Sequence, residues 1–271
     1  MRQIAPNVYT EISGRGSNVS WVVTKEGVVI IDTPTVPSDA VKLRDEISKY
    51  GPIRYVINTE PHMDHFAGNS FLGATLIGHD GVREAILQAS IEQLQDMLKR
   101  FAPEGPPPAK DFRFRPPDIT YSQSLTLHLG SHTIRLINMP GHTPFQSVVY
   151  VPEEKVVFTS DNVVYRVAPF LHQSVPFAWL DTLQKMQQFE ADTFVPGHGN
   201  ACDKSGIKDM STLIQAWIDS VQKAVDAGIP LEDAKKQITM VGRFPYLTRE
   251  ARTEMIEGMN ITRLYEVLKK R

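Results

Sequence analysis

Short apolar runs separated by turn residues dominate the first third of the chain and predict a β-rich opening. One run alternates apolar and polar side chains, and two more flank the turn Lys25-Glu26-Gly27, which favours antiparallel pairing. Helical spacing then predicts a helix that Ser38 would cap, and a longer helix further on. The expected strands are residues 8–12, 19–23, 28–32, 53–58 and 74–78, and the expected helices are residues 37–49 and 81–101.

The middle of the chain changes character. The segment 102–118 contains six prolines in 17 positions, which excludes a helix or a central strand and predicts a surface loop. The later strands are expected at residues 124–129, 133–138, 147–151, 155–159 and 193–195, and the later helices at residues 182–190, 208–228, 231–238 and 248–269. Two β-rich halves with helices predict two packed sheets covered by helices. We expect one α/β domain over residues 1–205 and a helical extension, residues 206–271, packed on it.

Composition narrows the class of protein. With 271 residues and 41% hydrophobic content, the chain is long enough for an ordinary globular core. The net charge of −2 gives no electrostatic basis for binding nucleic acid. The start of the chain lacks the apolar run of a signal peptide, and no apolar run approaches membrane-spanning length, so we expect a cytoplasmic protein with no membrane partner. The single cysteine, Cys202, leaves nitrogen and oxygen atoms to hold any metal ion.

Side chains able to bind a metal ion follow four of the apolar runs. The run at residues 53–57 ends in Glu60-Pro61-His62-Met63-Asp64-His65, where Pro61 stops both strand and helix. His142, Asp161 and His198 each come directly after a later run. Glycine precedes both of these histidines, which lets the backbone turn and a bulky neighbour approach. If the four strand ends converge, they make one site.

Each candidate by itself has an ordinary explanation. A histidine after Pro-Gly is more often a turn residue, and an aspartate at a strand end is more often a helix cap. These explanations fail for the joint pattern, because His-x-Asp-His is a dense cluster and further candidates recur in the same local setting. The candidate metal ligands are Glu60, His62, Asp64, His65, His142, Asp161 and His198.

This order of motifs resembles the metallo-β-lactamase superfamily over residues 5–200, including the strand end Ile30-Ile31-Asp32-Thr33. The resemblance implies an αββα sandwich, with two mixed β-sheets flanked by helices. It implies a first metal ion held by His62 and His142 and a second held by Asp64, His65 and His198. Asp161 would bridge the two ions. The superfamily hosts many reactions, so the fold by itself does not give the substrate.

Glu60 stands where the usual family motif, His-x-His-x-Asp-His, has its first histidine. Either Glu60 replaces that histidine as a ligand, or the first site is weak. Carboxylates bind zinc, and they are relatively better ligands for harder ions such as iron or manganese. We therefore expect two zinc ions, with a single ion, or iron or manganese, as the alternatives. The added negative charge predicts a less Lewis-acidic first site.

The resemblance implies a hydrolase in which a metal-activated hydroxide cleaves a carbonyl-derived bond of a small molecule, such as a lactone, β-lactam, ester or thioester. No Gly-x-Ser-x-Gly motif offers a protein nucleophile. Asp64 is the candidate catalytic residue, because it can orient the hydroxide and carry a proton to the leaving group. The alternatives are an iron-dependent redox enzyme of this fold, a phosphodiesterase and a non-catalytic metal-binding protein.

Other side chains are candidates for supporting roles. Tyr165 and His172 follow Asp161 in a loop-like stretch where relatives build the substrate wall, so both are candidate substrate contacts; Arg15 and Phe145 are weaker ones. Asp32 is expected to hydrogen-bond to a metal ligand rather than to bind metal itself.

The C-terminal helices have three open roles. A lid, a substrate wall and a homodimer contact are all compatible with the sequence, and packing on the sandwich is the default expectation. Met255, Met259 and Leu264 are spaced as a core-facing stripe on the last helix.

Overall fold

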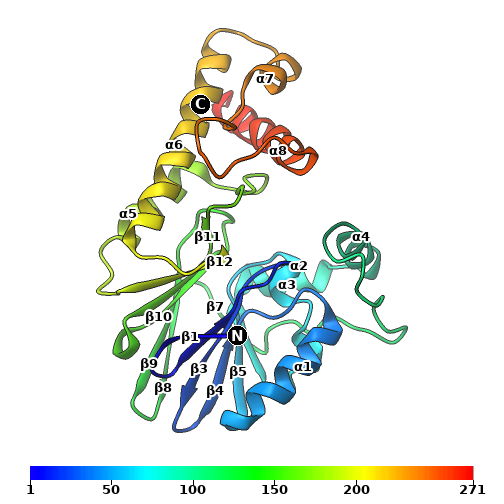
Figure 1. The fold of residues 1–271 in the computed structure, drawn as a ribbon, viewed down its shortest axis with the longest axis vertical. Helices are drawn as coiled ribbons and strands as arrows, with labels where there is room; N and C mark the ends of the chain where they lie inside the picture. Colours follow the sequence, from blue (N-terminus) through cyan, green and yellow to red (C-terminus); the bar gives the residue numbers. More distant parts are fainter. Residues whose placement is uncertain (271) are drawn as a thin grey trace.

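Two β-sheets packed face to face form the centre of the molecule in the computed structural model, which describes residues 1–270 (Figure 1). The seven-stranded sheet has the strand order β1-β2-β3-β4-β5-β6-β7, and the five-stranded sheet has the order β12-β11-β10-β9-β8. The first sheet consists of β1 (Arg2–Ala5), β2 (Val8–Glu11), β3 (Val19–Thr24), β4 (Gly27–Ile31), β5 (Ile53–Asn58), β6 (Thr75–His79) and β7 (Ile119–Tyr121). The second consists of β8 (Ser124–Leu129), β9 (His132–Asn138), β10 (Ser147–Val151), β11 (Val156–Tyr165) and β12 (Thr193–Gly199).

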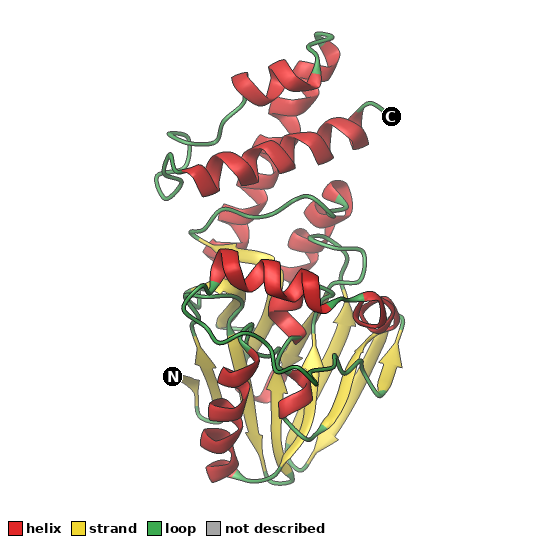
Figure 2. Cartoon of the chain, turned by 90° about the vertical axis from the view of Figure 1, so that its right-hand side faces the viewer, coloured by secondary structure: helices red, strands yellow, loops and turns green. Residues whose placement is uncertain are grey.

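Helices cover the outer faces of both sheets, which confirms the αββα sandwich that the resemblance implies (Figure 2). They are α1 (Pro37–Ile47), α2 (Met63–Phe66), α3 (Asp80–Gln88), α4 (Ile91–Phe101), α5 (Pro176–Met186), α6 (Lys204–Asp226), α7 (Leu231–Gln237) and α8 (Ala251–Leu268), with 3-10 turns at Ser48–Tyr50, Asn69–Phe71 and Pro152–Glu154. Among the described residues, no helix has the length and apolar composition needed to cross a membrane.

Alternating side chains of β10 show how the layers form. Val149 and Val151 lie in the apolar cluster between the two sheets, whereas Val148 and Tyr150 lie in the cluster that also contains residues of α5 and α6. Successive residues of a strand point to opposite faces, so this strand is buried on both sides. Each buried aliphatic side chain contributes about 1.5–3 kcal/mol. A shift by one residue would exchange the two faces, so burial fixes the register.

Both sheets are mixed, and their topology brings the candidate ligands to one edge. Strands β4, β5 and β6 run parallel in the first sheet, and β11 and β12 run parallel in the second. Strand β9 is antiparallel to β10, which is antiparallel to β11, so β9 and β11 have the same direction. The carboxyl ends of these strands therefore meet at the same edge of each sheet. Asp32, Glu60, His142 and His198 come at or just after these ends.

The C-terminal helices extend the second helical layer. Trp217 of α6 and Leu264 of α8 belong to the same buried cluster as Trp179 of α5 and Val157 of β11. Helix α8 lies beyond the edge of the sandwich that carries the candidate ligands (Figure 1). The division of the chain at residue 205 stays a prediction.

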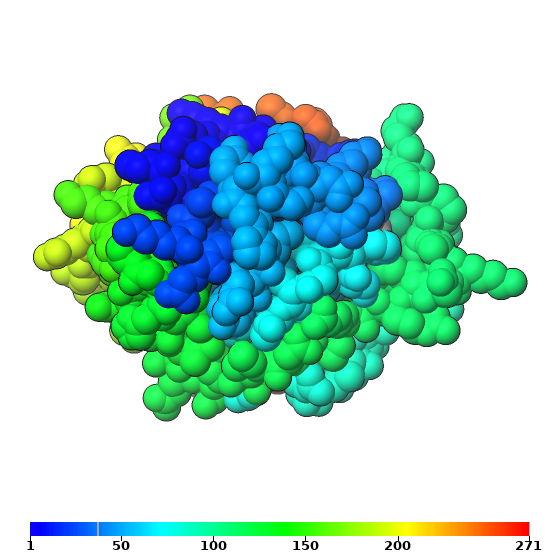
Figure 3. Space-filling model, turned by 90° about the horizontal axis from the view of Figure 1, so that it is seen from below, coloured from blue at the N-terminus to red at the C-terminus, as the bar shows by residue number. Residues whose placement is uncertain are grey.

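The loop 102–118 largely follows the sequence-based expectation. It joins α4 to β7, and from below its neighbourhood projects from one side of the molecule (Figure 3). Phe112 is nevertheless buried, in a small cluster with Leu94 and Leu98 of α4. The loop is thus partly fastened to the helix before it.

One helix prediction missed a break, another is wrong in its bounds by more than a turn, and one predicted helix cap is wrong. The expected helix 81–101 is two helices, because Ser90 starts α4 with a capping box. The Ser90 hydroxyl accepts from the Gln93 backbone N–H, and the Gln93 side-chain oxygen accepts from the Ser90 backbone N–H. The expected helix 182–190 begins earlier, at Pro176, since proline suits the first turn of a helix. Ser38 does not cap α1; the residue at the cap is Val36, without a side-chain hydrogen bond.

The strand predictions missed β1 and β7 and ended β11 too early. Strand β11 continues to Tyr165, so Asp161 lies within a strand rather than at its end. Its pairing with β12 is irregular between Phe158 and Val164, and Ser160 has a φ of 47°. Apolar periodicity cannot reveal such an irregularity in strand pairing. The predicted stripe on the last helix is also wrong in part, because Met255 and Met259 are 40% and 37% exposed.

At the opposite end of the sandwich, Glu154 joins the two sheets. Its carboxylate accepts from the Asn7 side chain at 2.7 Å and lies 2.9 Å from His132 Nε2. We expect Glu154→Ala to lower the free energy of unfolding by about 1–3 kcal/mol, because buried partners lose their hydrogen bonds. Urea unfolding at pH 7 measures this, with the exposed Glu104→Ala as control. An equal effect of the two variants would contradict it.

Candidate metal centre

The turn after β5 places four candidate ligands within six residues. Strand β5 ends at Asn58, and His62 precedes the first turn of α2 with an extended backbone. Glu60 and His65 are completely buried, whereas the side chains of His62 and Asp64 keep 21% and 23% of their surface exposed. The exposed pair marks the side on which the cluster opens to solvent.

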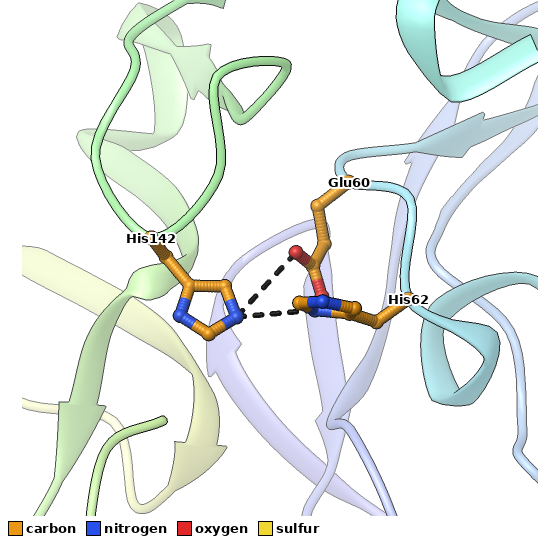
Figure 4. Close-up of side chains that lie close together, drawn as sticks. All are labelled: Glu60, His62 and His142. Atoms are coloured by element: carbon orange, nitrogen blue, oxygen red, sulfur yellow. Dashed lines mark hydrogen bonds and ion pairs between the residues drawn. The ribbon is translucent and has the colours of Figure 1, made fainter. Parts of the chain in front are cut away.

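Glu60, His62 and His142 form the first group of candidate ligands (Figure 4). Glu60 Oε1 lies 2.9 Å from His62 Nδ1, and His142 Nε2 lies 3.1 Å from the same nitrogen. His142 Nε2 is 3.7 Å from Glu60 Oε2. Figure 4 shows Glu60 and His62 on the loop after β5 and His142 facing them from the other sheet. The two sheets therefore meet at this group.

Asp64, His65 and His198 form the second group. His198 Nε2 lies 3.3 Å from Asp64 Oδ2, and His65 Nε2 lies 4.0 Å from the same oxygen. Asp161 stands between the groups, because its Oδ2 is 3.3 Å from His198 Nε2 and 3.7 Å from His142 Nε2. Its Oδ1 is 3.4 Å from His65 Nε2. The structure thus brings all seven candidate ligands together.

Glu60 occupies a more central place than the sequence suggests. Its Oε1 lies 3.0 Å from His65 Nε2 as well as 2.9 Å from His62 Nδ1. One carboxylate therefore faces histidines of both groups, and Glu60 also makes a third group with His65 and Asp161.

Asp32 fixes the orientation of His65, which confirms the expected hydrogen bond. Its Oδ2 lies 2.9 Å from His65 Nδ1, so that Nε2 faces the cluster. Asp32 also accepts from the Thr59 backbone N–H at 2.8 Å and from the Thr59 hydroxyl at 2.6 Å. Asp32 has a φ of 58°, a region that aspartate tolerates better than most residues. Three hydrogen bonds thus hold a carboxylate that is only 3% exposed.

Gly141 and Gly197 make room for the cluster, as expected. Glycine is required at both positions because a Cβ atom would not fit, not because the backbone has a positive φ. A Cβ atom at Gly197 would overlap Asp161 Oδ1, and one at Gly141 would overlap Asn162 Oδ1 and lie 2.7 Å from the Trp179 ring. Neither glycine has a positive φ. Gly197 is therefore a point of close approach between β12 and β11, and Gly141 is one between the loop after β9 and both β11 and α5.

Asn18 is a positioning residue that the sequence analysis did not find. Its amide nitrogen donates to the carbonyl oxygens of Pro196 at 2.9 Å and Gly199 at 2.7 Å, one on each side of His198. Its backbone N–H donates to the Gly197 carbonyl. The end of β12, which carries His198, is thus hydrogen-bonded to a residue directly before β3 that precedes Pro196 by 178 positions. No local sequence pattern reveals such a contact.

Mutual attraction outweighs burial for most groups of the cluster. Burial raises the pKa of Asp64 and of Asp161, but the neighbouring histidines bring both well below the usual range. Burial lowers the pKa of His62 and of His198, yet the surrounding carboxylates raise these to about 9 and about 10. The carboxylates are therefore ionised at neutral pH, and they favour positive charge among them.

The residues fit a divalent metal ion. Glu60 Oε2, His65 Nε2 and Asp161 Oδ1 are buried within the cluster without a hydrogen-bond partner. Unpartnered buried polar atoms are costly, and coordination would satisfy them together. Imidazole nitrogens and carboxylate oxygens are the donor set of zinc and other first-row divalent ions.

The comparisons with known proteins agree with this geometry. A family model described as metallo-beta-lactamase superfamily matches residues 12–198, which is more than half of the chain. The chain belongs to the metallo-β-lactamase superfamily.

Relatives within the superfamily are distant. A linear primary-alkylsulfatase of Pseudomonas sp. is 24% identical over 231 residues, covering 72% of this chain and 43% of that protein. A hydroxyacylglutathione hydrolase of Brucella anthropi is 24% identical over 170 residues, covering 61% of this chain and 53% of that protein. The chain thus spans about half the length of the curated relatives it matches.

Solved structures show the same fold. A metallo-beta-lactamase from Pontibacter korlensis superposes with a TM-score of 0.63 at 22% identity, over 79% of this chain and 97% of that one. A stereoselective inverting sec-alkylsulfatase from Pseudomonas sp. superposes with a TM-score of 0.71 at 14% identity, over 98% of this chain and 49% of that one. The second superposition includes the C-terminal helices.

Of the two candidate substrate contacts, His172 has a side chain that contacts the candidate metal cluster. Its ring stacks on the His62 ring, with centroids 5.1 Å apart and planes at 24°. The Tyr165 ring instead faces Gly206 at the start of α6, and Arg166 lies over it. Among the described residues, neither a side-chain hydrogen bond nor a ring contact joins the Tyr165 side chain to the cluster. Their roles in substrate binding stay predictions.

The weaker candidates make other contacts. Phe145 stacks on His79 at 5.4 Å and covers Gly81 at the start of α3. Arg15 pairs with Asp39 of α1 at 2.7 Å. Cys202 packs against Gly206, and burial raises the pKa of its thiol to about 12, which disfavours the reactive thiolate form at neutral pH.

Removing metal is expected to make stability depend on pH. A histidine with a raised folded-state pKa contributes stability that is complete below its unfolded pKa, near 6.5, and is lost as pH rises through the folded value. For His62 and His198 that window ends at about 9 and about 10. We expect the melting temperature of chelator-treated protein to fall between pH 7 and pH 10, and that of metal-loaded protein to change less. Parallel curves would contradict this.

Proposed function

We propose that this superfamily member is a metal-dependent hydrolase that cleaves a carbonyl-derived bond of a small molecule, such as a lactone, β-lactam, ester or thioester. The observation that carries the proposal is the convergence of seven nitrogen and oxygen ligands, from both sheets, at one partly open edge. A metal-dependent hydrolase needs both a charged centre that can hold metal ions and an opening through which substrate and water enter.

Two zinc ions are the proposed cofactors. His62 and His142 with Glu60 would hold one ion, and Asp64, His65 and His198 would hold the other. Asp161 faces both groups and would be shared between the ions. A bound divalent ion supplies Lewis-acid chemistry, polarising the bond to be cleaved and making water more acidic.

The protein's own groups divide the remaining work. Glu60 and His65 are completely buried, so their role would be to bind metal and fix its position from the side that water and substrate do not reach. Asp64 is a partly exposed carboxylate on the open side, with 23% of its side-chain surface accessible, and it is the proposed catalytic residue. Because its pKa lies well below the usual range, its carboxylate is ionised and can orient the attacking water by accepting its hydrogen bond. His172 would line the approach beside His62.

Sulfate-ester hydrolysis is the second candidate. The likeness to the sec-alkylsulfatase extends over 98% of this chain, and so includes α6 to α8, whereas the likeness to the Pontibacter korlensis enzyme covers 79%. The curated alkylsulfatase matches 72% of the chain. Parallel assays with alkyl sulfates and with lactones, thioesters and β-lactams distinguish the two candidates by which bond is cleaved.

Elemental analysis of protein purified without added metal tests the proposal. We expect close to two zinc ions per chain in the wild type and a fall towards one in Glu60→Ala, because this variant removes the only carboxylate of the first group. Glu60→His restores a family-type ligand and is expected to keep two ions. The measurement is inductively coupled plasma mass spectrometry on all three proteins.

The results of the metal analysis and of the substrate assays decide between the proposed function and its alternatives. Predominant iron would replace the hydrolase proposal with the redox alternative, and activity on phosphodiesters alone would replace the carbonyl substrate. No bound metal in any of the three proteins would overturn the metal-dependent hydrolase. Cytoplasmic location and a homodimer remain predictions that fractionation and light scattering would test.

A further inference from the structure

The outer nitrogen of His62 has a partner that no ligand motif contains. His62 Nδ1 faces Glu60 and His142, and His62 Nε2 lies 3.1 Å from Gln173 Oε1. Gln173 lies on the segment 166–175, between β11 and α5. The ring of His62 is thus held between the cluster on one side and this segment on the other.

The chemistry of imidazole determines which atom donates the hydrogen bond between His62 and Gln173. A neutral ring carries one N–H, so if Nδ1 is the metal-binding nitrogen, the proton is on Nε2. Nε2 then donates to Gln173 Oε1. Partners of this kind fix the tautomer and the ring orientation of metal-binding histidines. His65 has Asp32 in the same role, and among residues 1–270 the partner of His62 Nε2 is Gln173.

Helix α8 holds the segment that carries Gln173. The completely buried Asn260 accepts from the Leu171 backbone N–H at 2.7 Å and donates to the Pro169 carbonyl at 2.9 Å. Arg263 donates from Nε and Nη2 to the Ser174 carbonyl, at 3.0 and 2.7 Å. These bonds fix the segment on both sides of Gln173.

Two backbone bonds complete the support. The Ser174 N–H donates to the Leu171 carbonyl at 2.9 Å, which closes a turn around His172 and Gln173. The Val175 N–H donates to the carbonyl of Gly141, directly before His142. One short segment therefore joins α8, the His142 loop and the outer face of His62.

We infer that Gln173 is a positioning residue that fixes the ring of His62 for metal binding, and that Asn260 and Arg263 of α8 hold Gln173 in place. The C-terminal helix is then part of the support of the metal centre rather than a separate appendage. This inference rests on the proposed metal-dependent function.

Metal affinity is the readout. Zn²⁺ binding to the chelated full-length protein is measured by competition with a chromogenic chelator, and Co²⁺ binding by its visible spectrum. We expect Gln173→Ala to weaken one of the two binding events about 10- to 100-fold, as loss of such partners does. Gln173→Glu keeps an acceptor and is expected to retain wild-type affinity. Arg263→Ala is expected to weaken the same binding event as Gln173→Ala.

A matched control separates positioning from stability. Gln187 is a surface glutamine whose amide donates to the Lys204 carbonyl at 3.0 Å, away from the cluster, so Gln187→Ala is expected to leave both binding events unchanged. Melting temperatures of the chelated proteins report folding separately. If the wild type binds no Zn²⁺ or Co²⁺, the proposed function fails. If the wild type binds both ions and Gln173→Ala binds them equally well, only the present inference fails.

Discussion

Replacing Gly197 by alanine is expected to abolish metal binding at the shared position between the two groups. Gly197 is buried directly before His198, and a Cβ atom there would overlap Asp161 Oδ1 and lie 2.9 Å from the Asp161 backbone nitrogen. The neighbouring backbone belongs to β11 and cannot retreat easily, because β11 is buried along almost its whole length. Either Asp161 or His198 must therefore leave its place, and both are candidate ligands.

The measurement is metal content together with hydrolytic activity of Gly197→Ala. We expect the variant to lose nearly all bound metal and activity while its secondary structure remains. Gly258→Ala is the control, because nothing lies within 4 Å of a Cβ atom at this position of α8 and alanine favours a helix. Wild-type metal content in Gly197→Ala would show that the cluster can rearrange around Asp161.

Periodicity predicted the central strands well because burial on two faces leaves an unmistakable apolar run. Strand β4 is buried at every position, and its expected range, residues 28–32, agrees with the structure within one residue at each end. Strand β7 has only three residues, one of them exposed, so its pattern is too short to recognise. Strand β1 is an edge strand with two exposed residues, and the same limit applies.

One of the two errors in the helix predictions could have been avoided from the local sequence, and the other could not. The apolar spacing of residues 81–101 continues across Ser90, so periodicity alone joins two helices into one. The capping box that separates them was readable from Ser90 and Gln93, three positions apart. The exposure of Met255 and Met259 was not readable, because it depends on what α8 packs against rather than on its own spacing.

The candidate ligands were predictable because strand direction carries them to one place. Strands that run in the same direction end at the same edge of their sheet, so a histidine after β9 and another within the end of β12 lie at one edge of the second sheet. The packing of the two sheets brings this edge to the turn after β5. The supporting residues were predictable only where a strand end marks them, as with Asp32. Asn18 and Gln173 reach the cluster through contacts with residues far along the chain, and no periodicity or motif identifies them.

Replacing Asp32 is expected to have the second large effect, and two variants separate its two roles. Asp32→Asn keeps the side-chain shape and the tolerance of a positive φ, but it removes the negative charge that His65 Nδ1 faces. We expect it to weaken metal binding about 10- to 100-fold with a small change in stability. The loss would concern the second group, where His65 is the completely buried ligand.

Asp32→Ala removes the acceptor altogether. The Thr59 backbone N–H and His65 Nδ1 would then be buried without partners, which costs about 1–3 kcal/mol for each group, and alanine tolerates the φ of 58° less well. Metal affinity and urea unfolding of both variants measure the two effects. Because the amide introduced by Asp32→Asn could still contact His65, wild-type affinity in that variant would mean that charge is dispensable there. Wild-type affinity in Asp32→Ala would mean that His65 is oriented by the sandwich alone.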